Sequence, residues 1–586
     1  MKKLIAILLS LMLVCGAVSA MAETISIMYG GGTPRSIDPA LNTATNGSNT
    51  LRHACAGLMG FQLDENGVPV LAPEIAESYE ISEDAMTYTF KLREGLKWSN
   101  GDDFKASQLV NSWNRAVSEE LAAEYAYMYG VVALNDDGSL MISADDEAGT
   151  FTASVVAPTP YFLQLMAFPT FMPVPDHADN DGVWATNPET YVGLGAFRMA
   201  SYAVDDVIVF EKNPYYWNAD KVTLETINCY LAEEPIAIQT AYENGTVIFA
   251  EGLPATDYDR LNAEFPGELQ FRPMLGTYYI LMNVHKDLSP VGGEPMSIQD
   301  QAKTRIALGK MINRQDLVDY VTRGGQTPAT GFFPAGLGDG LNMNIRASET
   351  YGTWYANTGV PSEENEDFTI DQVEGINELI ALGYTYTGSI EGGDIAFSDI
   401  PSIEFSFNNS GANALIIQYV QDTWNKIGIP STINQEPWST LQSSLVAGDA
   451  EAARMGWIAD FNDCVNFLEI FLSVSGNNYP RLGKDLGTYT RNTELTADAG
   501  TGAYWGPNGD QTWVEVFDGL VKAIQLETDS AARAEMCAEG ERILMATGGV
   551  APVYFYTRPV LIKSTIQDLI MVDTNDTLWN YVTITE

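Results

Sequence analysis

The chain has 586 residues, of which 77 are acidic and 31 basic, so its formal net charge at pH 7 is −46. A field of that sign repels phosphate backbones and anionic membranes, which argues against nucleic acid as a partner. Hydrophobic residues make up 46% of the chain, and this content excludes a disordered protein. The length exceeds what one hydrophobic core normally serves, so two or three domains are expected.

The first 22 residues have the layout of a secretory signal peptide. Lysines precede an apolar run over residues 4–14, and small residues lead to Ala22, after which cleavage is expected. The run is shorter than the roughly 20 residues that span a bilayer, so we expect a soluble protein exported to the periplasmic space or the outer face of the cell membrane. A lipid anchor at Cys15 is the competing interpretation, although Val14 is larger than the small residue that lipoprotein cleavage usually needs.

Strands and helices can be predicted from the spacing of apolar residues. In chain order, a tight turn at residues 83–84 precedes a half-buried strand over residues 86–93, and a second strand covers residues 207–210. A helix is expected over residues 302–312, with Asn313 capping the next helix and glycines 324 and 325 ending it. A further helix over residues 412–427 should stop at Gly428, with a strand over residues 429–433 after it.

These elements alternate along the chain, so the predicted fold class is mixed α/β. No internal repeat or low-complexity linker is present, so domain borders are expected inside compact connections, as when a chain crosses between lobes more than once. Four cysteines remain after residue 22, namely Cys55, Cys229, Cys464 and Cys537, and they form no C-x-x-C motif. Four cysteines can pair in three ways, and the sequence leaves all three open. The three histidines have no partner at metal-ligand spacing, so we expect no metal and no cofactor.

Several segments match one known family in the same order. The longest, A-P-E-I-A-E-S-Y-E-I to S-Q-L-V-N-S-W, covers residues 72–113. The others are S-I-D-P-A at 36–40, G-L-G-A-F-R at 193–198, K-N-P-Y-Y-W at 212–217, G-T-Y-Y at 276–279, R-M-G-W-I-A-D-F at 454–461 and P-V-Y-F-Y at 552–556. Together they resemble the extracytoplasmic solute-binding proteins, family 5, of peptide ABC importers, and are most similar to the oligopeptide-binding type.

The resemblance implies a two-lobed α/β fold, the periplasmic-binding-protein type II fold, with an extra domain inserted in the first lobe. Lobe I would comprise residues 23–44, 191–275 and 557–586, the inserted domain residues 45–190, and lobe II residues 276–556. The lobes would close about a hinge around the ligand. The family's mode of action implies a monomer that captures short peptides in the interlobe cleft and delivers them to the permease of an ABC transporter.

The resemblance also assigns residues to the ligand site. Asp460 would hold the amino terminus of the peptide, because a buried ammonium group keeps its charge only when paired. Gly456 and Ile458 would offer backbone groups to an extended peptide, and Trp457 would line a pocket wall. These roles suit a protein that must accept many sequences, since all peptides share a backbone and two charged ends.

Three further residues follow from the same alignment. Tyr125 would reach the ligand from the inserted domain, Thr45 would make a main-chain contact, and Arg454 would lie near the ligand's carboxylate, which a guanidinium fork suits. The sequence also departs from the oligopeptide pattern, because Asn413 and Leu445 stand where relatives carry basic residues. Peptide length and ligand identity are therefore open.

Two other functions compete with peptide capture. The same fold serves relatives that bind a metal chelate, haem or an oligosaccharide, and the predicted aspartate favours peptides over these. A secreted hydrolase would need a catalytic signature, but the sequence has no G-x-S-x-G or Walker motif, and 77 acidic residues make chance carboxylate pairs inevitable. We therefore expect a binding protein and not an enzyme.

Overall fold

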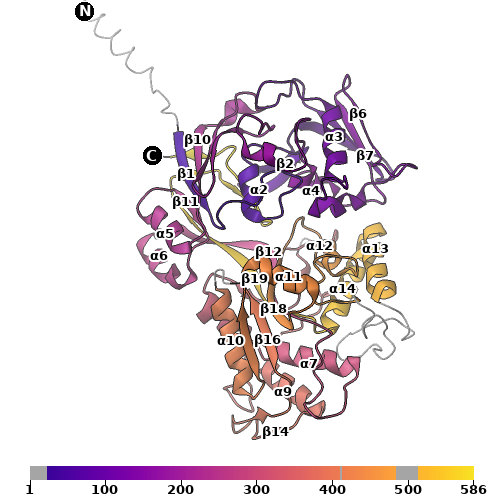
Figure 1. The fold of residues 1–586 in the computed structure, drawn as a ribbon, viewed down its shortest axis with the longest axis vertical. Coiled ribbons are helices and arrows are strands. Elements are labelled where there is room, and N and C mark those ends of the chain that lie inside the picture. The colour runs from indigo at the N-terminus through magenta and orange to yellow at the C-terminus, as the bar shows by residue number, and fades with distance from the viewer. Residues whose placement is uncertain (1–22, 343, 409–411, 484–512, 586) are drawn as a thin grey trace, which may run out of the picture.

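The computed structural model describes residues 23–342, 344–408, 412–483 and 513–585, so the predicted signal peptide and Cys15 lie outside the described residues. Figure 1 shows an upper and a lower half with long strands running between them. Within the described residues, no helix has both the length and the apolar character needed to cross a membrane.

One sheet of 11 strands extends through both halves, in the order β17-β16-β18-β12-β19-β11-β1-β10-β9-β8, with β13 paired to β19. Its upper strands are β1 (Glu23–Tyr29), β8 (Phe197–Ala203), β9 (Val207–Lys212), β10 (Leu224–Leu231) and β11 (Phe249–Glu251). Its lower strands are β13 (Thr327–Pro328), β16 (Ile403–Phe407), β17 (Ser431–Gln435) and β18 (Ala452–Ile458). The halves are connected by β12 (Leu269–Met282) and β19 (Val550–Ile562), which lie between them in Figure 1.

The ladder between β12 and β19 is irregular where the chain passes from one half to the other. From Pro273 to Thr277, β12 advances four residues, while β19 advances two from Phe555 to Thr557. Gly276 lies in this bulge, and a Cβ there would come within 3.0 Å of the Trp457 carbonyl oxygen. A bulge bends its strand and increases the local twist, so the sheet changes direction between the halves.

The upper half also contains a second sheet in the order β4-β5-β7-β6 and a hairpin of β2 and β3. The strands are β2 (Met59–Leu63), β3 (Pro69–Pro73), β4 (Ala76–Ile81), β5 (Thr87–Leu92), β6 (Ile142–Asp145) and β7 (Thr150–Ser154). The predicted strand over residues 86–93 is confirmed as β5, in which Tyr88, Phe90 and Leu92 are buried and alternate with partly exposed residues. The predicted strand over residues 207–210 is confirmed as the first part of β9.

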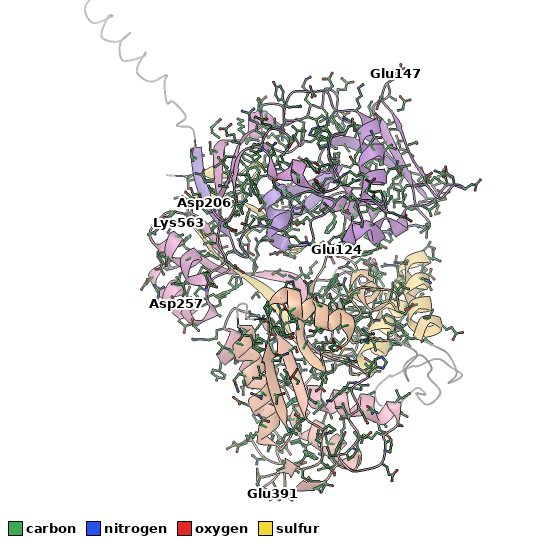
Figure 2. The ribbon with its side chains drawn as sticks, viewed as in Figure 1. Glu124, Glu147, Asp206, Asp257, Glu391 and Lys563 are labelled. Atoms are coloured by element: carbon green, nitrogen blue, oxygen red, sulfur yellow. A yellow bond between two sulfur atoms is a disulfide. The ribbon has the colours of Figure 1, made fainter. Side chains whose placement is uncertain are left out.

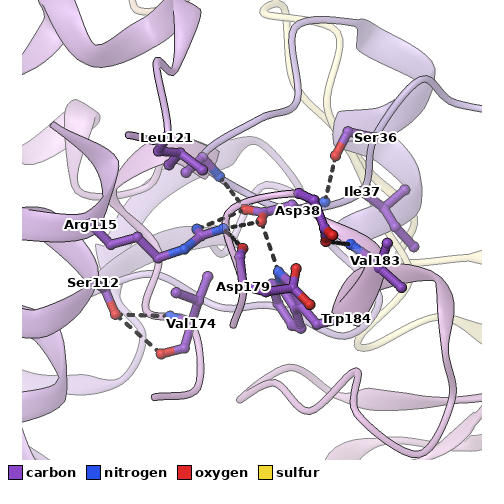
Figure 3. A network of polar contacts seen from close by, with 12 residues as sticks. Ser36, Ile37, Asp38, Ser112, Arg115, Leu121, Val174, Asp179, Val183 and Trp184 are labelled. Atoms are coloured by element: carbon purple, nitrogen blue, oxygen red, sulfur yellow. Dashed lines mark hydrogen bonds and ion pairs between the residues drawn. The ribbon is translucent and has the colours of Figure 1, made fainter. Parts of the chain in front are cut away.

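The upper helices are α2 (Thr45–Leu51), α3 (Ala106–Ala116), α4 (Phe162–Leu165), α5 (Pro235–Glu243) and α6 (Tyr258–Glu264). Figure 3 shows how the S-I-D-P-A segment is tied to α3: the carboxylate of Asp38 accepts hydrogen bonds from Arg115 and Trp184. The distances are 2.7 Å from Arg115 Nη2 and 2.8 Å from Trp184 Nε1, and Asp38 is fully buried. This paired carboxylate fixes the chain just before α2, which carries one wall of the site described below.

The lower helices are α7 (Ile298–Lys310), α8 (Arg314–Asp316), α9 (Ile370–Ala381), α10 (Asn413–Lys426), α11 (Trp438–Ala447), α12 (Val465–Leu468), α13 (Gly519–Leu526) and α14 (Ser530–Ala546). Short strand pairs complete the fold: β14 (Tyr386–Thr387) with β15 (Ala396–Phe397), β20 (Ile566–Gln567) with β23 (Thr583–Ile584), and β21 (Ile570–Met571) with β22 (Thr577–Leu578).

The predicted lower helices are confirmed, with shifted ends. Helix α7 begins four residues earlier than expected, because Ser297 accepts a hydrogen bond from the Asp300 amide and caps it. Asn313 caps the next helix as predicted. The strand expected from residue 429 begins at Ser431 instead, because the Ile429 amide donates to Trp424 O at 3.0 Å and closes the C-terminal turn of α10 around Gly428.

Of the three possible pairings, the structure contains the Cys464–Cys537 bond, with Cα atoms 6.3 Å apart. Cys55 and Cys229 are free and buried. Burial raises the pKa of each of these two thiols to about 12, because the apolar surroundings disfavour the thiolate.

Neither free cysteine should react in the native protein. At pH 8 a disulfide-exchange reagent is expected to label no thiol of the folded, mature chain on the timescale of minutes, since both are protonated and shielded. In denaturant two thiols should react, and after reduction four. Rapid labelling of either cysteine before unfolding would contradict the packing described here.

Candidate functional site

Two cavities lie between elements of the upper and lower halves. The large cavity, of about 1060 Å³, is bounded above by the segment around Glu124, which Figure 2 labels where the two halves face each other, and below by α11 and residues 469–479. The small cavity, of about 180 Å³, is lined by residues from three distant parts of the chain: 42–45 with Ser48, Tyr125 with Phe168, and 457–460 with 574–576.

Five of the seven residues predicted from the sequence line the small cavity: Thr45, Tyr125, Trp457, Ile458 and Asp460. Thr45 opens helix α2, and Tyr125 lies in a 3₁₀ helix over Glu124–Val131. Trp457 and Ile458 are the last two residues of β18, and Asp460 lies two residues beyond its end. Arg454 and Gly456 lie earlier in β18 and line neither cavity. The tertiary structure therefore brings together residues that are more than 300 positions apart.

Asp460 is held by three hydrogen bonds. Tyr125 Oη donates to its Oδ1 at 3.1 Å, Asn466 Nδ2 donates to its Oδ2 at 3.2 Å, and its own amide donates to Asn466 Oδ1 at 3.0 Å. Its side chain remains partly open to the cavity. Desolvation raises the pKa of this carboxyl to about 7, although both side-chain hydrogen bonds act in the opposite direction.

The electrostatic surroundings of Asp460 favour a cation as ligand. The other carboxylate of the small cavity, Asp576, is neutralised by Arg52, whose Nε and Nη2 donate to it at 2.8 and 2.7 Å. Among the described residues no basic side chain contributes to the pKa of Asp460, and Asp576 raises it. A ligand ammonium placed here would supply the missing charge and return the aspartate to its ionised form.

Beside this carboxylate, strand β18 presents backbone groups that pair with no other strand in the described part of the chain. Ala459 N donates to Leu275 O and Asn283 N donates to Glu451 O, so the odd-numbered residues of β18 form the ladder with β12. Hydrogen-bonding directions alternate along an antiparallel strand, so the backbone groups of Gly456 and Ile458 point away from β12. On that side β16 pairs with β18 only as far as Ala453 in the described residues.

A Cβ at position 456 would lie 2.2 Å from Tyr556 Oη, so any larger residue here would have to displace the side chain of Tyr556. Two residues earlier in β18, Arg454 is half-buried and donates from Nε and Nη2 to Asn408 Oδ1 at 2.9 and 2.6 Å. Its guanidinium lies 5.4 Å from the ring centre of Trp438. Asn413 and Leu445, the two departures from the family pattern, are buried and carry no charge.

Sequence reasoning missed Asn466 and Glu469, which lie on the far side of the same loop. Asn466 is fully buried and also accepts a hydrogen bond from Trp457 Nε1 at 3.1 Å, while its Nδ2 lies 3.2 Å from Glu469 Oε1. Burial and the neighbouring Asp460 raise the pKa of Glu469 to about 8. The spacing of six and nine residues from Asp460 is no signal in itself, because Asn466 lies in α12 and Glu469 directly after it, and only the fold places these residues beside Asp460.

The loop that carries these groups is anchored to helix α14. Arg533 Nη2 donates to Asp463 Oδ1 at 2.7 Å, and both side chains are buried. The next residue, Cys464, is bonded to Cys537 of the same helix. Two adjacent residues of the loop are thus attached to one rigid element, which restricts where Asp460 and Asn466 can lie.

Among the described residues, no group of three or more histidine, cysteine, aspartate or glutamate side chains is arranged to hold a metal ion. His53 is buried in the upper half, and burial lowers its pKa to about 3. It packs between Phe197 and Phe210, with ring centres 6.1 and 4.9 Å away. This histidine is part of a hydrophobic core.

The protein has two halves connected by crossing strands, with cavities between the halves. At their junction lies a carboxylate whose surroundings favour a cationic ligand. These features define a two-lobed solute-binding protein. Residues 70–479 match the model of the bacterial extracellular solute-binding proteins, family 5 (middle), and the chain belongs to this family. The family consists of substrate-binding proteins and not of enzymes. This result confirms the family and fold class predicted from the sequence.

Curated relatives cover nearly the whole chain. The chain is 29% identical to the oligopeptide-binding protein OppA of Bacillus subtilis over 558 residues, which cover 93% of this chain and 89% of that protein. It is 27% identical to the periplasmic oligopeptide-binding protein OppA of Haemophilus influenzae, with 94% and 92% covered.

Solved structures share the fold. The murein tripeptide-binding protein MppA of Escherichia coli has a TM-score of 0.73 at 22% identity, with 97% of this chain and 100% of that chain covered. OppA of Haemophilus influenzae in complex with the peptide RPPGFSPFR also has a TM-score of 0.73, at 24% identity and 96% and 99% coverage. The unliganded open form of MppA is less similar, with a TM-score of 0.64 at 22% identity and 96% and 98% coverage.

Proposed function

We propose that this protein binds short peptides between its two halves and delivers them to the membrane permease of an ABC importer. The observation that carries the proposal is the carboxylate of Asp460 in the small cavity, which has no basic partner among the described residues and lies next to the backbone groups of Gly456 and Ile458 that point away from β12. An ammonium end and an extended backbone are what every peptide offers. A site made of these two features accepts peptides without reading their side chains.

The two ends of the ligand would be held at opposite ends of β18. The amino terminus pairs with Asp460 and the carboxylate lies near Arg454, six residues earlier, which corresponds to about 20 Å of extended strand. Trp457 forms the wall between these points, and Thr45 and Tyr125 cover the amino terminus from the upper half. Because Asn413 and Leu445 carry no charge, Arg454 is the carboxylate partner that this arrangement offers to short peptides.

The contacts across the cleft support a closed arrangement. Tyr125 binds Asp460, Asn462 N donates to Gln164 Oε1 at 2.8 Å, and Tyr161 stacks on Phe461 with ring centres 4.4 Å apart. Opening would break these contacts while the strands β12 and β19 bend at their bulge.

In this proposal lobe I comprises residues 23–44, 191–275 and 557–586, the inserted domain residues 45–190, and lobe II residues 276–556. The bulge of β12 lies at the border between lobes I and II, and the second sheet lies wholly within the inserted domain. The protein acts as an exported monomer without catalytic activity, after removal of residues 1–22.

Mass spectrometry tests the function directly. The mature protein is purified without denaturant, stripped of ligand, incubated with a pool of peptides of two to five residues, separated from free peptide and then unfolded. We expect intact peptides to be released, with little selection among the side chains that follow the first residue, since water in roomy pockets satisfies differing groups. A parallel sample with Asp460 replaced by asparagine should release far less.

Three outcomes would count against the proposal. Cleaved peptides would indicate a hydrolase. Recovery of a saccharide, haem or metal chelate from the protein as isolated, with no peptide bound from the pool, would move the function to another solute of the family. Equal peptide release from wild type and the asparagine variant would remove Asp460 from the site.

A further inference from the structure

The large cavity is much bigger than an amino terminus requires, and its charges are unevenly arranged. Three charged side chains line it: Arg35, Glu124 and Glu469. Arg35 and Glu124 form an ion pair at 2.9 Å, and both are largely exposed at the entrance. Glu469 is half-buried, at the side of the cavity formed by the lower half.

Glu469 lacks a positive partner in the described structure. Its Oε1 accepts a hydrogen bond from Asn466 Nδ2 at 3.2 Å, and the charged groups that act on it are the carboxylates of Asp460 and Asp463. These neighbours and its burial raise its pKa to about 8. Half-burial without a cation nearby disfavours the ionised form of this carboxyl, and a ligand cation would stabilise that form.

The position of Glu469 relative to Asp460 limits which part of a ligand it can reach. One nitrogen, Asn466 Nδ2, lies 3.2 Å from Asp460 Oδ2 and 3.2 Å from Glu469 Oε1. The two carboxylate oxygens are therefore at most about 6.5 Å apart, the span of two successive hydrogen bonds. A side chain that reaches Glu469 while the ammonium terminus is at Asp460 belongs to the first residue of the peptide.

We propose that the large cavity is a specificity pocket for the first side chain of the ligand, and that Glu469 makes it selective for a basic residue, lysine or arginine. The proposal rests on the proposed peptide-binding function and extends it. The apolar stem of such a side chain would lie against Val446, Phe461 and Leu472, which line the cavity, while its charge reaches the carboxylate. The strong negative charge of the whole protein adds to the attraction of cationic peptides.

Titration calorimetry with the ligand-stripped mature chain tests this inference. The probes are three tripeptides that differ only in the first residue, which is lysine, norleucine or glutamate, followed by two alanines. We expect the lysine peptide to bind at least tenfold more tightly than the norleucine peptide, because only the lysine ammonium can form a charge-assisted hydrogen bond with the carboxylate of Glu469. The glutamate peptide should bind most weakly.

Matched variants then assign the preference to one residue. In Glu469→Gln the lysine peptide should lose its advantage, while the affinity for the norleucine peptide changes less than threefold. Glu211→Gln makes the same chemical change on β9, beside the exposed Arg198, and should keep the preference intact. Moving the lysine to the third position of the peptide should also abolish the advantage.

Two results would overturn the inference while leaving the proposed function in place: equal affinity of the wild type for the lysine and norleucine peptides, or an unchanged lysine preference in Glu469→Gln. A preference that survives the move of lysine to the third position would overturn the placement of the first residue. If none of the tripeptides or of the corresponding pentapeptides binds, the proposed function itself fails, so the two failures are distinguishable.

Discussion

Replacing Asp460 by asparagine is expected to weaken the binding of a tripeptide more than tenfold at pH 7.5. The ligand ammonium would lose its charged partner on closure, and truncating one member of a buried charge pair typically costs about 2 to 5 kcal/mol. Asn466 can still donate to the amide oxygen, and the hydroxyl group of Tyr125 can rotate to accept a hydrogen bond from the amide nitrogen, so the geometry of the cavity should persist. Titration calorimetry measures the loss, with Asp422→Asn on the exposed face of α10 as the matched control.

The same variant should make the ligand-free protein more stable at alkaline pH. In the folded chain the pKa of Asp460 is about 7, above its ordinary value of 3.8, so the folded state binds this proton more tightly than the unfolded state. Stability is therefore lost as pH rises from about 4 to about 7, and the loss persists above 7. Asparagine cannot ionise, so the free energy of unfolding of the variant should equal that of the wild type at pH 4 and exceed it by about 1 to 2 kcal/mol at pH 8.

Thermal unfolding of the wild type and of the Asp460→Asn variant at pH 4, 6 and 8 measures whether the stability difference increases with pH as expected. An asparagine variant that is equally destabilised at all three values would contradict the desolvation of Asp460. Peptide affinity of the wild type should also fall as pH decreases below 7, because binding then requires the aspartate to release its proton. A peptide affinity that stays constant from pH 8 to pH 5 would show that peptide binding does not require the ionised carboxylate of Asp460.

Replacing Arg533 by methionine is expected to lower the free energy of unfolding by about 3 to 5 kcal/mol, since it leaves the buried carboxylate of Asp463 without its partner. Arg533 also donates to Asp339 O at 2.6 Å and to Ile524 O at 3.2 Å, and both carbonyl groups would lose these bonds. The loop from Asp460 to Asn466 should become less well positioned, so peptide affinity should fall as well.

Denaturant unfolding at pH 7 measures the effect, and helix α14 supplies its own control. Arg542 is on the same helix and pairs with Glu539 at 2.6 Å, but that pair is partly exposed, so Arg542→Met should cost less than about 1 kcal/mol. Adding Asp463→Asn to the Arg533 variant should recover part of the stability, because no buried charge then remains. Equal losses for the two arginine variants would refute the anchoring role of Arg533.

Local signals in the sequence predicted individual elements well. The alternation around Tyr88 and Phe90 predicted β5, and the three- and four-residue spacing before Gly428 predicted α10. Errors were confined to element ends. There a hydrogen bond between specific backbone groups decides the boundary, as at Ile429, and periodicity does not report such bonds.

Only some residues of the candidate site were predicted from the sequence, and there is a physical reason why the others were not. Residues within a recognisable motif, such as Asp460 and Trp457, could be assigned through the resemblance to a family. Asn466, which links Asp460 to Glu469, belongs to no motif of the family resemblance. It could be assigned to the site only from the fold, in which α12 places its side chain between those two carboxylates. The choice of Cys464–Cys537 among three pairings likewise depended on which cysteines the fold brings within bonding distance.

The sequence by itself predicted the α/β class and the local elements, because these depend on side-chain chemistry and short-range spacing. The resemblance of its motifs indicated the family and made Asp460 the candidate partner of a peptide amino terminus. The tertiary structure alone decided which distant residues share a cavity, that no basic side chain of the described residues pairs with Asp460, and that a second carboxylate lies beside it. Burial and electrostatic environment are properties of surroundings assembled from the whole chain, so no segment read in isolation contains them.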